Sequence, residues 1–372
     1  MIPPDPAQLW ARLPDDAQEL LTRLRRLTNP QARLALVGGA VRDLLLGQAS
    51  ASPDLDIVLA GGNVQQVADQ LGAAFSWHPA YGNATLHLPG GIYADLVSAR
   101  SERYPVAGGP PMPLPGSLED DLARRDFTVN ALALELLADG KTGLLGVPNG
   151  LDDLEARLLR PLHPQSLHQD ASRLVRAARL AARLGLHAHP ELLAQVPAAL
   201  DIAPRTPRLD AELRLLLEEP LPGKAARALE DWGAGALLPI GAAPLLERLD
   251  ALPGHKIRTL YAAALHSLPW SADRFEALGL GQRPAELLAR VRSGASASPG
   301  SPEATLQSLL NLTPPYPPLQ GRDLLALGLN AGPELGRMLG WLAGEREAGR
   351  VTSAEDERGA VQARLKADGL ER

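Results

Sequence analysis

Two aspartates that stand two positions apart in a predicted strand, Asp54 and Asp56, are the residues in this sequence best suited to chemistry. They lie in the run Pro-Asp-Leu-Asp-Ile-Val-Leu at 53–59. Side chains at positions i and i+2 of a strand project from the same face, so both carboxylates point together while Leu55 points into the core. Oxygen ligands at this spacing suit Mg²⁺ or Mn²⁺ that bridges substrate phosphates. The alternative interpretation is a strand end with two solvated aspartates.

A pair of glycines precedes this strand. Gly38 and Gly39 stand between an apolar strand and a helical segment in the run Leu-Val-Gly-Gly-Ala-Val-Arg-Asp at 36–43. Backbone N–H groups at such a turn can approach a phosphate, and Arg42 adds a positive charge. The alternative is an ordinary turn with a surface arginine. Because the turn comes shortly before the two aspartates, the combination favours nucleotide chemistry.

Three further groups of polar residues follow along the chain. Asp95, in a predicted strand at 92–97, is either a third carboxylate for in-line phosphoryl transfer or a surface aspartate. The run Arg-Arg-Asp-Phe-Thr-Val-Asn-Ala at 124–131 either contacts a triphosphate and ribose or is a solvated helix start. A third group, Arg173, Arg176, Arg179 and Arg183, falls on one face of a predicted helix, with no acidic residue between Asp170 and Leu184. A solvated face normally mixes charges, so these arginines predict an anionic or base-edge partner.

The elements that position these residues change character along the chain. Short apolar runs alternate with helical segments from Arg33 to about residue 140, which predicts an α/β domain. Beyond Asp126 the composition predicts an almost entirely helical chain. The segment from Tyr104 to Gly116 has five prolines and three glycines and is predicted to be an irregular loop. Residues 293–302 are predicted to be a linker.

Composition excludes several classes of function. The chain of 372 residues is 45% hydrophobic and 22% charged, which predicts a folded protein of two or three domains. Aromatic residues make up 3%, so an RNA-binding sheet built on aromatics is disfavoured. Cysteine is absent, which excludes thiolate chemistry and fits the predicted cytoplasmic location. No apolar run of 18 residues and no signal-peptide pattern is present, so no membrane partner is expected.

Taken together, these motifs resemble the class II tRNA nucleotidyltransferase and bacterial poly(A) polymerase family, a branch of the polymerase-β-like superfamily. The resemblance rests on the runs at 38–43, 54–56, 124–131 and 170–179, which occur in the family's order and at plausible spacing. It is clear from about residue 33 to 186. A fainter similarity is present near the C-terminus, at 321–324 and 332–336.

The resemblance implies a role for each motif. Asp54 and Asp56 would bind the catalytic metals, Mg²⁺ or Mn²⁺. Asp95 stays a candidate third catalytic carboxylate on the strand pattern described above. The incoming ATP or CTP would be bound by residues from the glycine turn, from the run at 124–131 and from the arginine helix. These nucleotide-binding candidates are Gly38, Gly39, Arg42, Asp43, Arg125, Asp126, Asn130, Asp170, Arg173, Arg176 and Arg179. Of these, Asp170 and Arg173 would read the edge of the base.

The family's architecture is an α+β fold, in which a polymerase-β-like head domain with a mixed sheet precedes an all-helical neck, body and tail. By this resemblance, residues 1–32 form an N-terminal helical extension and residues 33–140 the head. Residues 141–203 form the neck, which recognises the base, and residues 204–292 the body. Residues 303–372 form the tail, which binds tRNA.

The activity implied is template-independent addition of CMP, AMP or both to the 3′ end of tRNA. Enzymes that add only CC tend to have a shortened loop after the third carboxylate strand, and Arg100 to Pro115 is retained here, which favours addition of the terminal A, alone or after CC. Two alternatives stay open: a poly(A) polymerase, and a catalytically silent RNA- or nucleotide-binding protein. A fused phosphohydrolase would need adjacent His-Asp metal ligands, and no His-Asp pair occurs in the chain.

Overall fold

The computed structural model describes residues 4–48, 54–88, 92–254, 256–294, 297–312, 318–330, 332–347, 350–351 and 353–367. The chain divides into two compact units, Met1–Leu238 and Pro239–Arg372. Each unit is described by itself below.

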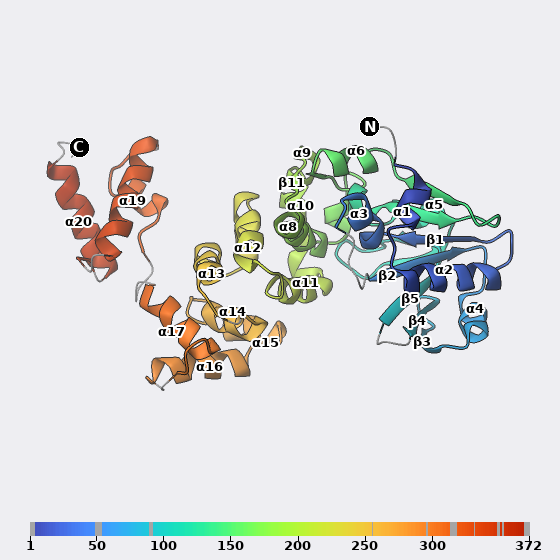
Figure 1. The fold of residues 1–372 in the computed structure, drawn as a ribbon. Coiled ribbons are helices and arrows are strands. Elements are labelled where there is room, and N and C mark those ends of the chain that lie inside the picture. The colour runs from blue at the N-terminus through green and yellow to red at the C-terminus, as the bar shows by residue number, and fades with distance from the viewer. Residues whose placement is uncertain are drawn as a thin grey trace. The chain divides into compact units, whose positions relative to one another are not determined.

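A seven-stranded mixed sheet forms the centre of the first unit (Figure 1), with the strand order β3-β4-β5-β2-β1-β8-β9. Strands β2 and β5 run parallel, and the other neighbours in the sheet are antiparallel. The strands are β1 (Arg33–Val37), β2 (Leu55–Ala60), β3 (Ala74–His78), β4 (Asn83–Leu88), β5 (Ile92–Ser98), β8 (Leu132–Leu136) and β9 (Thr142–Gly146). The mixed sheet confirms the predicted α+β class.

Short helices and one hairpin surround this sheet. The helix α3 directly follows β1, and α4 contacts α2, β4 and β5. Asn63 caps α4 by accepting a hydrogen bond from Gln66 N, and Gly72 ends it in the left-handed conformation. These elements are α1 (Pro6–Trp10), α2 (Asp15–Leu27), α3 (Gly39–Leu45), α4 (Val64–Leu71), the hairpin β6 (Arg100–Arg103) and β7 (Met112–Pro115), α5 (Leu118–Ala123) and η2 (Thr128–Asn130).

The rest of the first unit is mainly helical. Its central helix, α8, packs against α11 and α12 and ends at Gly185, which has a φ of 64°. The elements are α6 (Gly150–Glu155), β10 (Leu158–Leu159), α7 (Ser166–Gln169), α8 (Ser172–Leu184), β11 (His187–Ala188), α9 (Pro190–Leu193), α10 (Val196–Ile202), η3 (Ala203–Arg205), α11 (Arg208–Leu216), α12 (Pro222–Asp231) and η4 (Gly235–Leu237).

The second unit contains only helices in its described residues. They are α13 (Ala242–Ala251), α14 (Arg258–Leu265), α15 (Ala272–Ala277), α16 (Gln282–Arg292), α17 (Pro302–Leu312), α18 (Gly321–Ala326), α19 (Pro333–Glu347) and α20 (Ala354–Ala367). The predicted linker at 293–302 falls between α16 and α17, and residues 295–296 of it lie outside the described residues. A small core joins α18 to α20 around Leu324, Leu342 and Val361.

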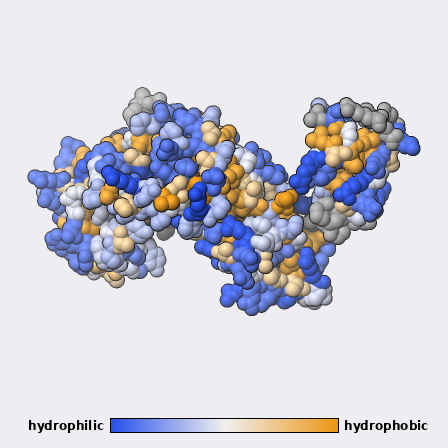
Figure 2. Space-filling model, turned by 180° about the vertical axis from the view of Figure 1, so that it is seen from behind, coloured by the Kyte–Doolittle hydropathy of each residue, from blue (hydrophilic) through white to orange (hydrophobic). Residues whose placement is uncertain are grey.

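The face of the molecule drawn in Figure 2 is mainly hydrophilic. Smaller hydrophobic areas lie between its hydrophilic side chains. Among the helices of the described residues, none combines the length and the apolar character needed to cross a membrane.

Three parts of the sheet and its hairpin correct the predictions from sequence. The chain beyond Asp126 was predicted to be almost entirely helical, but β8 and β9 are strands that carry the sheet past residue 140. Strand β3 was not predicted, and β7 lies within the segment predicted to be irregular. The residues of β8, Leu-Ala-Leu-Glu-Leu, are good helix formers, yet all five are buried between β1 and β9. Tertiary burial therefore overrides local propensity.

Candidate active site

One cavity of the first unit brings together every residue that the sequence motifs single out. It has a volume of about 1040 Å³ and opens between the sheet and the helices α8 and α11. All fourteen candidates line it: Gly38, Gly39, Arg42, Asp43, Asp54, Asp56, Asp95, Arg125, Asp126, Asn130, Asp170, Arg173, Arg176 and Arg179. Motifs separated by up to 141 residues in the chain, from Gly38 to Arg179, thus share one space.

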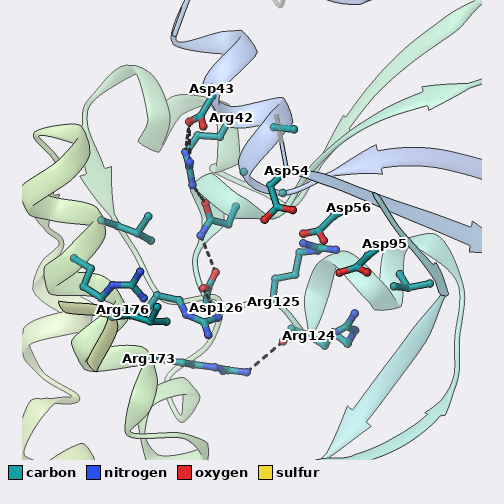
Figure 3. A pocket seen from close by; sticks show the side chains of 18 of the residues that line it. Arg42, Asp43, Asp54, Asp56, Asp95, Arg124, Arg125, Asp126, Arg173 and Arg176 are labelled. Carbon is teal, nitrogen blue, oxygen red and sulfur yellow. Dashed lines mark hydrogen bonds and ion pairs between the residues drawn. The ribbon is translucent and has the colours of Figure 1, made fainter. Parts of the chain in front are cut away.

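The three aspartates form a row at the edge of this cavity (Figure 3). Asp56 and Asp95 are direct partners in the register of β2 and β5, and Asp54 lies two positions before Asp56 on the same face. Leu55, between the two, is buried, as the alternation predicts. Burial raises the pKa of Asp56, the charge of Arg125 opposes this rise, and the neighbouring Asp54 and Asp95 add to it. A cation at this edge would relieve the repulsion.

The turn between β1 and α3 requires a glycine at its first position. Gly38 has a φ of 75° and a ψ of −131°, a conformation that residues with a side chain rarely adopt. A Cβ at this position would lie 2.8 Å from Nη1 of Arg125. Arg125 in turn donates from Nη2 to Oδ2 of Asp121 at 3.1 Å. The turn therefore brings a guanidinium group next to the aspartate row.

A chain of hydrogen bonds connects the glycine turn to the helical wall. Arg42 donates from Nη1 to Oδ1 of Asn130 at 2.6 Å, and Nδ2 of Asn130 donates to Oδ1 of Asp126 at 3.0 Å. Arg176 on α8 then donates from Nη1 to Oδ2 of Asp126 at 3.2 Å. Burial opposes ionisation of Asp126, but the charge of Arg176 and the hydrogen bond from Asn130 lower its pKa. These contacts favour the charged form of Asp126, and its hydrogen bond from Arg176 ties the helix α8 to the sheet domain.

The arginine face of α8 differs from its prediction in one respect. The absence of acidic residues in the same helix predicted an anionic ligand, but acidic residues from the chain after α10 lie against this face. Glu212 accepts hydrogen bonds from both Arg176 and Arg179, and Glu219 accepts one from Arg179 at 2.9 Å. Both glutamates are buried. Much of the positive charge of this face is therefore balanced within the protein.

The two predicted base-reading residues are held by protein groups in this structure. Oδ1 of Asp170 accepts from N and Oγ of Ser172, and Oδ2 forms a 2.9 Å ion pair with Arg208 of α11. Arg173 is buried, with 5% of the residue exposed. Its guanidinium donates from Nη1 to Oγ of Ser166 at 2.6 Å. Its Nη2 donates to the hydroxyl of Tyr104 and to the backbone oxygen of Arg124, the contact drawn in Figure 3.

Sequence reasoning left several cavity residues unassigned. Arg208 and Glu212 come from α11, and no local pattern in the sequence connects them with α8. Glu102, Tyr104 and Arg124 lie in or next to recognised motifs, and Glu102 pairs with Arg124 at 3.1 Å. Tyr104 is on the segment after β6 and reaches Arg173. For Glu102 and Tyr104 the signal was the run Arg-Ser-Glu-Arg-Tyr at 100–104, and Arg124 belongs to the run at 124–131 that was predicted to contact a triphosphate and ribose.

The donor set of the aspartate row fits a divalent cation bound partly by substrate. Among the side chains that the structure describes, no three His, Asp or Glu are placed together so that they could hold a metal ion by themselves. Mg²⁺ in nucleotide sites is usually held by one or two carboxylates, with phosphate oxygens and waters as the other ligands. Asp54 and Asp56 would supply those two carboxylates, and both line the cavity.

The chain is similar in sequence to known proteins. The family model of the poly(A) polymerase head domain matches residues 34–160. A CC-adding tRNA nucleotidyltransferase of Deinococcus radiodurans is 55% identical over 99% of this chain and 99% of its own length. The chain belongs to the tRNA nucleotidyltransferase family. An A-adding tRNA nucleotidyltransferase of Geobacter sulfurreducens is 35% identical over 53% of this chain and 23% of its own length.

Solved structures of the tRNA nucleotidyltransferase family share the fold of the chain. An apo form of a CCA-adding enzyme aligns over 97% of this chain and 99% of its own, with a TM-score of 0.66 and 23% identity. The predicted combination of a mixed-sheet head domain with a helical C-terminal part is thereby confirmed.

Proposed function

We propose that this member of the tRNA nucleotidyltransferase family adds cytidine residues, and not the terminal adenosine, to the 3′ end of tRNA. The observation that carries the choice of cytidine is the 55% identity over the whole chain to a CC-adding enzyme, whereas the A-adding relative matches only about half of this chain. This replaces the expectation of A addition that rested on the retained segment Arg100 to Pro115. In this chain the segment forms the hairpin β6–β7, and Gly108 N donates to the backbone oxygen of Gln169.

The arrangement of charge in the cavity supports an in-line transfer. Arg42 and Arg125 lie next to the glycine turn that follows β1 and would bind the triphosphate of CTP. Asp54 and Asp56 would hold a divalent cation, Mg²⁺ or Mn²⁺, which supplies charge neutralisation at the phosphates and makes the attacking hydroxyl more acidic. Asp95, on β5 at the end of the row away from β1, would accept the proton of the tRNA 3′-hydroxyl. The hydroxyl oxygen bonds to the α-phosphorus as the bond to the pyrophosphate oxygen breaks.

The base would bind at the wall formed by α8 and α11. A carboxylate accepts from the exocyclic amine of cytosine, and a guanidinium donates to its ring nitrogen and carbonyl. Asp170 and Arg173 are the proposed pair for this task. In the present structure the ion pair with Arg208 occupies Oδ2 of Asp170. We therefore infer that Arg208 gives up this position when the cytosine amine binds.

Three tRNA transcripts test the proposal. They end at the discriminator base, after the first C and after CC, and each is incubated with the protein, Mg²⁺ and either CTP or ATP. We expect CTP to extend the first two transcripts and ATP to extend none. Addition of A to the transcript that ends in CC would show that the product assignment is wrong, although the family assignment would stand.

A poly(A) polymerase is the second candidate with the same chemistry. It is less favoured because the relative that matches 99% of this chain at 55% identity is a CC-adding tRNA nucleotidyltransferase. A fourth substrate, an unstructured RNA of the same length as the transcripts, separates the two. Extension of this RNA by ATP would favour the polymerase. The cytoplasmic location stays a prediction, and a tRNA substrate agrees with it.

A further inference from the structure

The third carboxylate of the aspartate row is held by a threonine on the neighbouring strand. Thr85 on β4 is the direct register partner of Asp95 on β5. Its hydroxyl donates to Oδ1 of Asp95 at 2.7 Å. This is a short hydrogen bond to a carboxylate, of the kind that fixes a side-chain rotamer. One oxygen of Asp95 is thereby engaged, and Oδ2 is left for the cavity.

A histidine on the next strand fixes the threonine in turn. Nε2 of His78 on β3 lies 3.2 Å from Oγ1 of Thr85. The single hydrogen of the threonine hydroxyl points to Asp95, so this second bond requires that Nε2 of His78 carries a hydrogen and donates it. The result is a directed chain from His78 through Thr85 to Asp95, built from three neighbouring strands of one sheet face.

The hydrogen bonds from His78 through Thr85 to Asp95 lie on the side of the aspartate row from which the attacking hydroxyl is expected to approach. Two arginines of the cavity, Arg42 and Arg125, lie next to the glycine turn that follows β1. Strands β3 and β4 lie on the other side of the aspartate row from β1 and contain no Lys, Arg, Asp or Glu. In an in-line displacement the leaving pyrophosphate and the attacking hydroxyl are on opposite sides of the phosphorus. With the pyrophosphate bound by Arg42 and Arg125 next to this turn, the hydroxyl arrives on the side of β5 and β4, where Asp95 is held.

We propose that Thr85 is a positioning residue for the transfer step, and that it acts by holding Asp95 with Oδ2 turned to the incoming 3′-hydroxyl while His78 sets the direction of the Thr85 hydroxyl. This rests on the proposed function, because it takes Asp95 as the acceptor of the hydroxyl proton. Thr85 itself touches neither the nucleotide nor the reacting atoms.

The test compares variants that differ in one hydroxyl. Thr85→Val keeps the shape of the side chain and removes the donor, whereas Thr85→Ser keeps the donor. We expect Thr85→Val to lower kcat by about 10- to 100-fold, the usual effect of losing such an orienting bond, with the KM for the nucleotide unchanged. Thr85→Ser should restore kcat. The matched control is Ser76→Ala, because Ser76 is the register partner of Thr85 on β3 and bonds His87, not Asp95.

A double-mutant cycle separates positioning from a general structural effect. If Thr85 acts only through Asp95, then Thr85→Val should have no further effect on the single-turnover rate in an Asp95→Asn background. Equal losses in Thr85→Val, Thr85→Ser and Ser76→Ala, or an additive loss in the double variant, would overturn the inference. All assays use the nucleotide that the wild-type protein incorporates. A wild-type protein that extends no tRNA overturns the proposed function, whereas an active wild type with a fully active Thr85→Val overturns only the role of Thr85.

Discussion

Asp56 lies directly opposite Asp95 across the parallel strands β2 and β5. Two carboxylates in this position repel each other, and burial adds to the penalty by raising the pKa of Asp56. The pair is stable in the folded protein because the rest of the sheet fixes both strands. The site thus resembles a preformed cation site whose negative charge Arg125 balances only in part.

Removing a carboxylate of the row should stop the transfer without unfolding the protein. We expect Asp54→Ala and Asp56→Ala to abolish nucleotide incorporation, because each removes a proposed metal ligand and no core side chain. Affinity for tRNA, measured by equilibrium binding, should stay near that of the wild type. Full activity in either variant would contradict the assignment of the metal site.

The raised pKa of Asp56 predicts how stability depends on pH in the absence of metal. The folded state holds the proton of Asp56 more tightly than the unfolded state does. The contribution of Asp56 to the free energy of unfolding is therefore present below its ordinary pKa and is lost as pH rises through the raised pKa. The variant Asp56→Asn does not lose stability in this way, because an asparagine side chain does not ionise. Its Tm advantage over the wild type should therefore be absent near pH 3, grow above about pH 4 and level off.

The measurement for Asp56→Asn is thermal unfolding in a chelator over this pH range. Added Mg²⁺ should then raise the Tm of the wild type more than that of the variant, since a ligand stabilises only the state that binds it. A Tm difference that is constant with pH would show that burial of Asp56 has no such effect.

Gly38→Ala should weaken nucleotide binding through Arg125. The new Cβ would lie 2.8 Å from Nη1 of Arg125, and the positive φ adds strain of about 1–3 kcal/mol. We expect a higher KM for CTP together with a lower Tm. Gly47→Ala is the control, because Gly47 also has a positive φ, of 68°, but nothing lies within 4 Å of its Cβ. It should lose stability and keep its KM; an equal rise of KM in both variants would mean that strain alone is responsible.

Arg173→Ala should affect both stability and the choice of nucleotide. The buried guanidinium makes hydrogen bonds to Ser166, Tyr104 and Arg124, so its loss should destabilise the protein by about 1–3 kcal/mol. If the same group reads the base, discrimination between CTP and the other nucleotides should fall by about 1–3 kcal/mol per paired hydrogen bond. Values of kcat/KM for CTP, ATP, UTP and GTP measure this.

Arg176→Ala is the control for Arg173→Ala. Arg176 lies one turn further along α8 and bonds Asp126 and Glu212, so its removal should reduce the rate with less effect on nucleotide choice. Loss of stability in Arg173→Ala with unchanged preference would show that Arg173 is structural and that the base is read elsewhere.

Binding of tRNA should weaken steeply with salt in spite of the formal net charge of −6. Contacts between arginines and the phosphate backbone release counterions, and the logarithm of the affinity then falls linearly with the logarithm of the salt concentration. Equilibrium binding of the full chain to tRNA at increasing KCl concentration tests this. An affinity independent of salt would contradict phosphate contacts.

The sequence by itself determined the parts of the site that are local. Asp54 and Asp56 share a face because a strand has a period of two, and Gly38 stands where a positive φ is needed, so short runs of residues were enough to predict them. Strand β8 was not predictable, because its helix-forming residues become a strand only when both of their faces are buried.

Only the tertiary structure decided which charges meet. Arg176 looked unpartnered along its own helix, yet Glu212 reaches it from α11, 36 residues later. Thr85 and His78 carry no motif, and they gain a role only because β3, β4 and β5 pair in one register. A helix or strand period relates residues a few positions apart, whereas these contacts depend on how separate elements pack, and no local pattern encodes that.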